Sequence, residues 1–381
     1  MGWMSNQSMG KLRIFVLAGL VFWVGVAEAK RLIDKPLTYL IKNSDNSVAT
    51  FSFPFIQGED DLVAKRINVF LHVAELQMAP PELFRSEPLQ AATDSARNNS
   101  EMESGGIRTL NEGRVLSVGV IYVNRGYAGK RSYEFDARNG RLLLKDELLT
   151  PAGYKLLAKQ LVQLRKSRIR SQLSRLTKLL GSHTKKSPTD TPELIREEID
   201  IYKRCLEDRF EGSGLKSQLD DPGILNVEEH SLIFTKGPCS NQSIDELGDF
   251  TNKLSAEEVK PYLSSYGKYI LFAEGDGAIS AINPYSQVFW GKINGKIPVT
   301  LYLGSNYPLI REAQLKRAKY YYDKYRSVID LSVEKRGDLF ELTETDSKEI
   351  PKPVLSFKIY EGKLTGQWRG GGKSYSFEAA P

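Results

Sequence analysis

The C-terminal part of the chain, residues 285–381, constrains the fold most tightly. Apolar and polar residues alternate there in short runs, of which 297–303, 329–333 and 355–359 are the clearest. Alternation places the apolar side chains of each run on one face of a strand. Roughly seven or eight such strands joined by turns predict an all-β antiparallel barrel or sandwich.

Residues 30–272 show a mixed pattern. Apolar residues at helical spacing predict three main helices, over Asp60–Gln77, from Pro151 to Gly181 and over Pro192–Phe210. Alternating or β-branched runs predict strands near 50–55, 116–123 and 231–235. A hairpin over 132–144 is expected to turn at Asn139-Gly140. Ser255 and Glu258 predict a capping box.

Two polar stretches divide this pattern. Residues 84–112 are interpreted as a loop or insertion, and residues 273–284 as a linker to the C-terminal domain. The predicted fold class is therefore α+β. It combines a mixed α/β N-terminal region, 30–272, of antiparallel sheet and helices with the all-β domain, 285–381.

The N-terminus has the three parts of a secretory signal peptide. Two cations precede an uncharged apolar run, 14–26, and Ala27-Glu28-Ala29 then places small residues where a signal peptidase reads. A membrane anchor needs about 20 apolar residues, so this run is too short. We expect residues 1–29 to be removed between Ala29 and Lys30 and the mature protein to act in a bacterial periplasm. No later segment approaches the length of a transmembrane span.

The chain has two cysteines, Cys205 and Cys239, and both lie in the mature part. A single pair in an exported protein predicts one disulfide. A metal site would need further Cys or His ligands, and His230 is the only one close in sequence. We therefore predict a structural disulfide.

Scattered positions over about 50–270 resemble a family of extracytoplasmic domains. They are Phe53-Pro54, Ile67-Asn68, Tyr122 through Gly129, Phe135-Asp136, Gly140, Lys145-Asp146 and the closing stretch 258–267, EVKPYLSSYG. The pattern is similar to that of domains in the lysozyme-sensing anti-sigma factors of Gram-positive bacteria and beside some peptidoglycan deacetylases. Because that family includes a lysozyme receptor, the resemblance implies a role in binding an envelope-attacking enzyme.

The resemblance has one departure. The family often has Gly-Ala-His in a loop where this chain has Arg125-Gly126-Tyr127-Ala128-Gly129, so no His-dependent role is carried over. The C-terminal region is similar to small β domains appended to uncharacterised exported bacterial proteins, and this likeness implies no activity. It is carried by Phe289-Trp290-Gly291, Pro298-Val299, Tyr320-Tyr321-Tyr322, Glu344 and the pair Gly366 and Trp368.

The chain has no acidic residue between Glu147 and Asp190. The helix predicted from Pro151 carries most of the basic residues there. Six of them form a candidate interaction surface: Arg165, Lys166, Arg168, Arg170, Arg175 and Lys178. Such a face favours an acidic protein partner or contact with an anionic membrane surface. The alternative is an ordinary surface helix whose apolar stripe packs on its own domain.

Tyr320 and Tyr322 complete the candidate surface. They belong to a run, with Tyr321 and Tyr325, in or beside one predicted strand. Alternate residues of a strand face opposite sides, so at least one should point outward, and exposed Tyr beside Lys and Arg is typical of recognition surfaces. The alternative is a strand whose tyrosines belong to core and rim.

No motif in the sequence predicts catalysis. His72, His183 and His230 lie in separate elements without metal-ligand spacing. Nucleophile-elbow, zinc-protease and phosphate-loop patterns are absent, and adjacent glutamates such as Glu197-Glu198 do not face each other on a helix. We predict no catalytic residue, metal or cofactor. A formal net charge of +6 is too small, in an exported protein, to favour nucleic acid.

These observations predict an exported periplasmic binding protein. The leading hypothesis is an inhibitor or immunity protein that captures a secreted envelope-attacking enzyme, either a lysozyme-like hydrolase or an interbacterial phospholipase or peptidoglycan effector. Such a protein needs only a complementary surface with a few buried anchors, which leaves no spacing motif. One alternative is a carbohydrate- or lipid-binding envelope protein, with a cavity in the C-terminal domain lined by Trp290, Trp368 and tyrosines. Another is an enzyme whose carboxylates come from distant positions.

Overall fold

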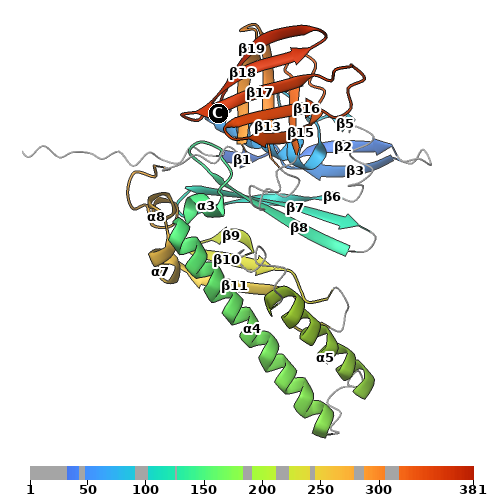
Figure 1. The fold of residues 1–381 in the computed structure, drawn as a ribbon, viewed down its shortest axis with the longest axis vertical. Helices are drawn as coiled ribbons and strands as arrows, with labels where there is room; N and C mark the ends of the chain where they lie inside the picture. Colours follow the sequence, from blue (N-terminus) through green and yellow to red (C-terminus); the bar gives the residue numbers. More distant parts are fainter. Residues whose placement is uncertain are drawn as a thin grey trace, which may run out of the picture.

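The computed structural model describes residues 32–42, 48–90, 102–124, 127–182, 191–211, 223–240, 245–278, 287–304 and 317–381. Figure 1 shows a β-barrel at one end of the molecule, small sheets in the middle and a pair of helices that projects at the other end. The predicted signal peptide and its cleavage site lie outside the described residues, so they stay predictions.

The C-terminal region is a closed antiparallel barrel of eight strands, which confirms the predicted α+β class and chooses the barrel over the sandwich. Its strands are β12 (Gln287–Ile293), β13 (Ile297–Leu303), β14 (Arg317–Tyr322), β15 (Ile329–Arg336), β16 (Leu339–Glu344), β17 (Val354–Tyr360), β18 (Lys363–Gly370) and β19 (Lys373–Ala380). Pairing of β12 with β19 closes the ring. Inward residues such as Phe289, Leu301 and Phe357 form one buried core, as in small barrels generally.

The residues before the long helix form small sheets around α1 (Asp61–Leu71), which continues into a π-helical turn, η1 (His72–Leu76). The strands are β1 (Leu32–Asp34), β2 (Leu37–Lys42), β3 (Val48–Phe53), β4 (Ile56–Gly58), β5 (Leu89–Gln90), β6 (Met102–Leu110), β7 (Val115–Asn124) and β8 (Tyr127–Asp136). They pair as β1-β4, β3-β2-β5 and β6-β7-β8. The side chain of Asp60 caps α1 by accepting hydrogen bonds from the backbone N–H groups of Leu62 and Val63.

One prediction for this region was wrong. The polar stretch 84–112 is more than a loop, because β6 occupies 102–110 and pairs with β7. An edge strand is held by backbone hydrogen bonds, so few apolar side chains are required. The predicted hairpin turning at Asn139-Gly140 is confirmed in its turn and pairing: after β8 the chain reverses, Phe135 bridges Leu142, and the Leu143 N–H donates to the Glu134 carbonyl oxygen (2.7 Å). Its first arm is the end of β8, which also forms a long ladder with β7.

The middle region combines helices with a third sheet. Its elements are α3 (Lys145–Leu148), α4 (Pro151–Ser182), α5 (Pro192–Leu206), η2 (Glu207–Glu211), β9 (Ile224–Glu228), β10 (Ser231–Lys236), β11 (Phe250–Ser255), α7 (Ala256–Val259), η4 (Lys260–Tyr262) and α8 (Ser265–Phe272). The sheet order is β11-β10-β9. The predicted capping box is confirmed, because Ser255 and Glu258 bond each other's backbone N–H groups at the start of α7.

The barrel shares a core with the α1 region. Val288, Tyr302 and Tyr321 point outward from the barrel wall and pack with residues of α1 and its sheets. The buried guanidinium of Arg141 adds a polar connection, donating to Gln287 of β12 (3.1 Å) and pairing with Glu147 of α3 (2.7 Å). Residues 279–284 of the predicted linker lie outside the described residues.

Candidate functional site

The first candidate site is the pair of helices α4 and α5, which we call the arm; it extends away from the barrel in Figure 1. The Thr150 hydroxyl accepts from the Gly153 N–H at the start of α4, and Thr191 caps α5 in the same way. Apolar residues at helical spacing then meet between the helices, including Ile169, Leu176 and Ile199. At 1.5 Å per residue, the 32 residues of α4 span about 48 Å.

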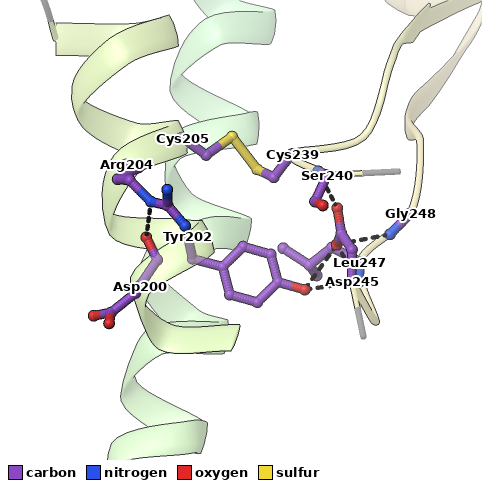
Figure 2. The surroundings of a disulfide bond; sticks show 9 residues. All are labelled: Asp200, Tyr202, Arg204, Cys205, Cys239, Ser240, Asp245, Leu247 and Gly248. Atoms are coloured by element: carbon purple, nitrogen blue, oxygen red, sulfur yellow. Dashed lines mark hydrogen bonds between the residues drawn. A yellow bond between two sulfur atoms is a disulfide. The ribbon is translucent and has the colours of Figure 1, made fainter. Parts of the chain in front are cut away.

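The predicted disulfide is confirmed and fixes the base of α5. Cys205 and Cys239 are bonded, with their Cα atoms 5.4 Å apart, so α5 is joined to the segment after β10. Figure 2 shows that Tyr202 lies beside this bond and reaches Asp245. The Tyr202 hydroxyl donates to the Asp245 carboxylate (2.8 Å) and accepts from the Leu247 N–H (3.0 Å). Burial raises the pKa of Tyr202, so the hydroxyl stays protonated.

A polar network crosses the arm one turn further along. Gln172 of α4 donates to Glu198 of α5 (3.1 Å) and to Glu246 (3.0 Å). The Arg175 guanidinium pairs with Glu246 and donates to Gln172 (2.9 Å). Arg175 therefore contributes hydrogen bonds and an ion pair within the arm, although its side chain remains about half exposed.

Arg165 does not belong to an exposed surface, and its assignment to the candidate surface was wrong. It is fully buried, with 0% exposure. The cause is helical geometry: Arg165 lies one turn from Leu161 and Ile169, so it shares their inward face. Lys166 and Arg168 are half-buried, with the Arg168 guanidinium over the Phe250 ring at 5.5 Å.

Arg170 and Lys178 are exposed, as are two lysines near the start of α4 that were not selected from the sequence. Four basic residues of α4 are spaced by four, seven and four positions, which places them in one row along the helix. They are the exposed Lys155 and Lys159, followed by Lys166 and Arg170. We call this the basic row. α4 itself contains no acidic residue. Beside the row, Leu156 is 60% exposed.

The tyrosines do not join this surface. Tyr320 is 2% exposed and lies in the barrel core, so its assignment to the candidate surface was wrong; Tyr322, on the same side of β14, is half-buried. The Tyr320 hydroxyl bonds to Glu344, and the two tyrosine hydroxyls are 3.2 Å apart. Burial raises the pKa of Glu344. Tyr320 and Tyr322 therefore belong to the core and rim of the barrel, as the alternative interpretation predicted. The barrel lies at the opposite end of the molecule from the arm (Figure 1).

In the described part of the barrel, Trp290 and Trp368 do not come together to line the predicted aromatic cavity. Trp290 packs on the α1 core outside the wall, whereas Trp368 packs on the interior core. Phe289, next to Trp290 on β12, faces the interior, and adjacent strand residues face opposite sides. The indole of Trp290 therefore points away from the interior that Trp368 faces. Phe289, Phe357 and Phe377 contribute to filling the interior.

Sequence reasoning missed Glu75, a buried acid of η1. Its carboxylate bonds to the Tyr133 hydroxyl and accepts from Arg131 at 2.8 Å. Burial raises its pKa, which the charge of Arg131 partly offsets. Leu71, one turn earlier, is a core residue, so helical spacing could have marked position 75 as buried. Both oxygens of the Glu75 carboxylate already accept hydrogen bonds from neighbouring side chains of β8, so this residue has a structural role in the core.

A second candidate site is a cavity of about 610 Å³ where α1, the segment 80–84 and the outer wall of the barrel meet. No local sequence pattern indicated it, because its walls come from segments more than 200 residues apart. In the described part of the chain, no group of three or more His, Cys, Asp or Glu side chains is placed to bind a metal ion. Among the described helices, none is both long and apolar enough to cross a bilayer.

The fold and sites together define an α+β protein with a closed eight-stranded barrel and a disulfide-linked helical arm. Comparisons with models of known families, with curated proteins and with solved structures found no match.

Proposed function

We propose that this protein is exported to the periplasm and captures a secreted envelope-attacking enzyme, as an inhibitor or immunity protein, through the arm. The observation that carries the proposal is the basic row on a helix that projects from the body and has no acidic residue of its own. A projecting cationic ridge attracts an acidic protein surface and speeds encounter. The disulfide and the Tyr202–Asp245 contact hold α5 in place, which lowers the entropy cost of binding.

The family resemblance supports the same class of target, an envelope-attacking enzyme such as a lysozyme-like hydrolase or a phospholipase. Leu156, exposed beside the row, offers an apolar anchor of the kind that contributes most binding energy once buried. The partner is therefore proposed to present an acidic rim around an apolar pocket.

The test uses the mature protein from Lys30, with its disulfide formed, against a secreted muramidase and a secreted phospholipase. We expect at least one enzyme to be inhibited at equimolar concentration and to co-elute with the protein in gel filtration. The variant Lys155→Glu, Lys159→Glu, Lys178→Glu reverses three exposed charges of α4. It should slow association at least tenfold and weaken the dependence of the rate on salt.

The matched control reverses three exposed lysines of the barrel, Lys358, Lys363 and Lys373, for the same change in net charge. It should leave inhibition unchanged. Equal effects of the two triple variants would assign the loss to net charge and contradict the role of the arm. Binding of the wild-type protein to anionic vesicles, with neither enzyme inhibited, would favour a membrane surface as the partner instead.

A further inference from the structure

The cavity between α1 and the barrel has walls that are fixed by their own hydrogen bonds. Asn68 of α1 accepts from the Ile56 N–H (2.7 Å) and donates to the Ile56 carbonyl oxygen (2.8 Å), so its side-chain amide acts as a neighbouring strand for β4. Across the cavity, Arg326 of the barrel donates to the Pro80 carbonyl oxygen and pairs with Glu82 at 3.3 Å. Three separate segments are thereby held around one preformed space, of the size typical of small-ligand sites.

The charged side chains around this space nearly cancel, since three carboxylates stand against two cations. The Arg326 guanidinium is already paired with Glu82, and Asp323 accepts a hydrogen bond from Thr300 (2.8 Å). Asp61 and Lys65, one turn apart on α1, supply one charge of each sign. A phosphate-rich ligand would need several cations that converge on it, and a polycation would need several carboxylates. The cavity therefore favours a ligand without net charge.

The cavity also combines ring surfaces with planar polar groups. Phe84 presents the most exposed ring, and the rings of Phe55, 6.4 Å from it between centroids, and Tyr321 of the barrel lie behind it with 5% and 3% exposure. Gln57 contributes a side-chain amide beside them. A fatty chain would desolvate such polar groups without replacing their hydrogen bonds, which is costly. A sugar ring matches both, because its C–H face packs on aromatic rings while its hydroxyls bond to amides and carboxylates.

We propose that this cavity binds a short neutral oligosaccharide, in addition to the protein-capture function of the arm. The inference rests on the lining of the cavity and is independent of the partner of the arm. Lys65 provides a built-in reporter, since its ammonium group lies 5.6 Å from the centre of the Trp290 ring, just outside the cavity. A ligand that engages Lys65 should change the fluorescence of Trp290.

The experiment titrates the mature protein, carrying Trp368→Phe so that Trp290 is its single tryptophan, with triacetylchitotriose and with maltotriose. Calorimetry on the unaltered protein runs in parallel. We expect saturable binding of at least one trisaccharide with Kd below about 1 mM. Phe84→Ala should weaken it at least tenfold. Tyr360→Ala, which removes an aromatic ring 73% exposed on the barrel, is the matched control and should not change it.

Gln57→Ala serves as a second cavity variant should Phe84→Ala fail to fold, and it should also weaken binding. Inorganic phosphate, trialanine and octanoate are the competing probes. Binding of one of these in place of both sugars, or sugar binding unchanged in the cavity variants, would overturn the proposal. The arm variant with three Lys→Glu changes should bind the sugar normally, which separates this test from that of the proposed function.

Discussion

The barrel and the arm close their cores in different ways. In the barrel each strand has hydrogen-bonded neighbours on both sides, and inward side chains from all eight strands fill one interior. In the arm two helices can bury only the faces they turn toward each other, and a disulfide joins α5 to the segment after β10. A closed sheet thus satisfies its backbone and fills its core by itself, whereas the projecting pair of helices is additionally fastened to the body by a disulfide.

The same difference decides which residues remain available to a partner. The barrel turns Tyr320 into its core, although an aromatic run of this kind is typical of recognition surfaces. The arm buries Arg165 but leaves Lys155, Lys159 and Lys178 exposed. A narrow core exposes more of its helices, and for that reason we propose the arm, rather than the barrel, as the binding element.

The largest effect is expected from a cavity in the barrel core. Phe357 is fully buried and stacks on Phe340 with ring centroids 5.5 Å apart. Phe357→Ala should lower the free energy of unfolding by about 3–5 kcal/mol, measured by chemical denaturation. Tyr360→Ala, three residues along the same strand, should change it by less than about 0.5 kcal/mol. Comparable losses for both variants would show that the barrel does not rely on its filled interior.

Removal of the disulfide should affect the arm rather than the barrel. The bond closes a loop between residues 34 positions apart, and the chain-entropy model gives a loss of about 4 kcal/mol for Cys205→Ala/Cys239→Ala. Hydrogen exchange should rise in α5 and in residues 245–250 while β12–β19 keep their protection. A uniform rise across the molecule would mean that arm and barrel unfold as one unit and would remove the contrast.

A smaller effect is expected from acid, acting on the core that α1 shares with the barrel. Burial lowers the pKa of His72 to about 3, from 6.5, while its ring bonds to the Asn68 carbonyl oxygen and the Tyr39 hydroxyl. Below pH 6.5 the His72 imidazole is protonated in the unfolded chain but stays neutral in the folded protein. The free energy of unfolding therefore falls as pH falls. The loss from this group should be about 1.5 kcal/mol between pH 6.5 and pH 5.

The matched variant His72→Gln should be less stable at pH 7 but should lack this part of the pH dependence. The measurement is the difference in free energy of unfolding between the two proteins at each pH, which removes the titration of all other groups. Parallel pH curves for the two proteins would show that His72 accepts a proton in the folded state.

Local sequence patterns predicted much of the fold. Alternation in 285–381 predicted barrel strands, helical spacing predicted α1, α4 and α5, and Ser255 with Glu258 predicted the start of α7. These features depend on residues within a few positions of one another. β6 was not predicted, because backbone hydrogen bonds pair it with β7 and such bonds leave no pattern in the side chains.

The sequence by itself indicated most of the helices and barrel strands, that one pair of cysteines is available to bond, and that α4 carries basic and no acidic residues. Only the tertiary structure decided that Arg165 and Tyr320 point inward, and that Asn68 and Arg326 hold opposite walls of one cavity. The physical reason is that periodicity fixes how residues are arranged on an element, but the face that is buried depends on which distant segment packs against it.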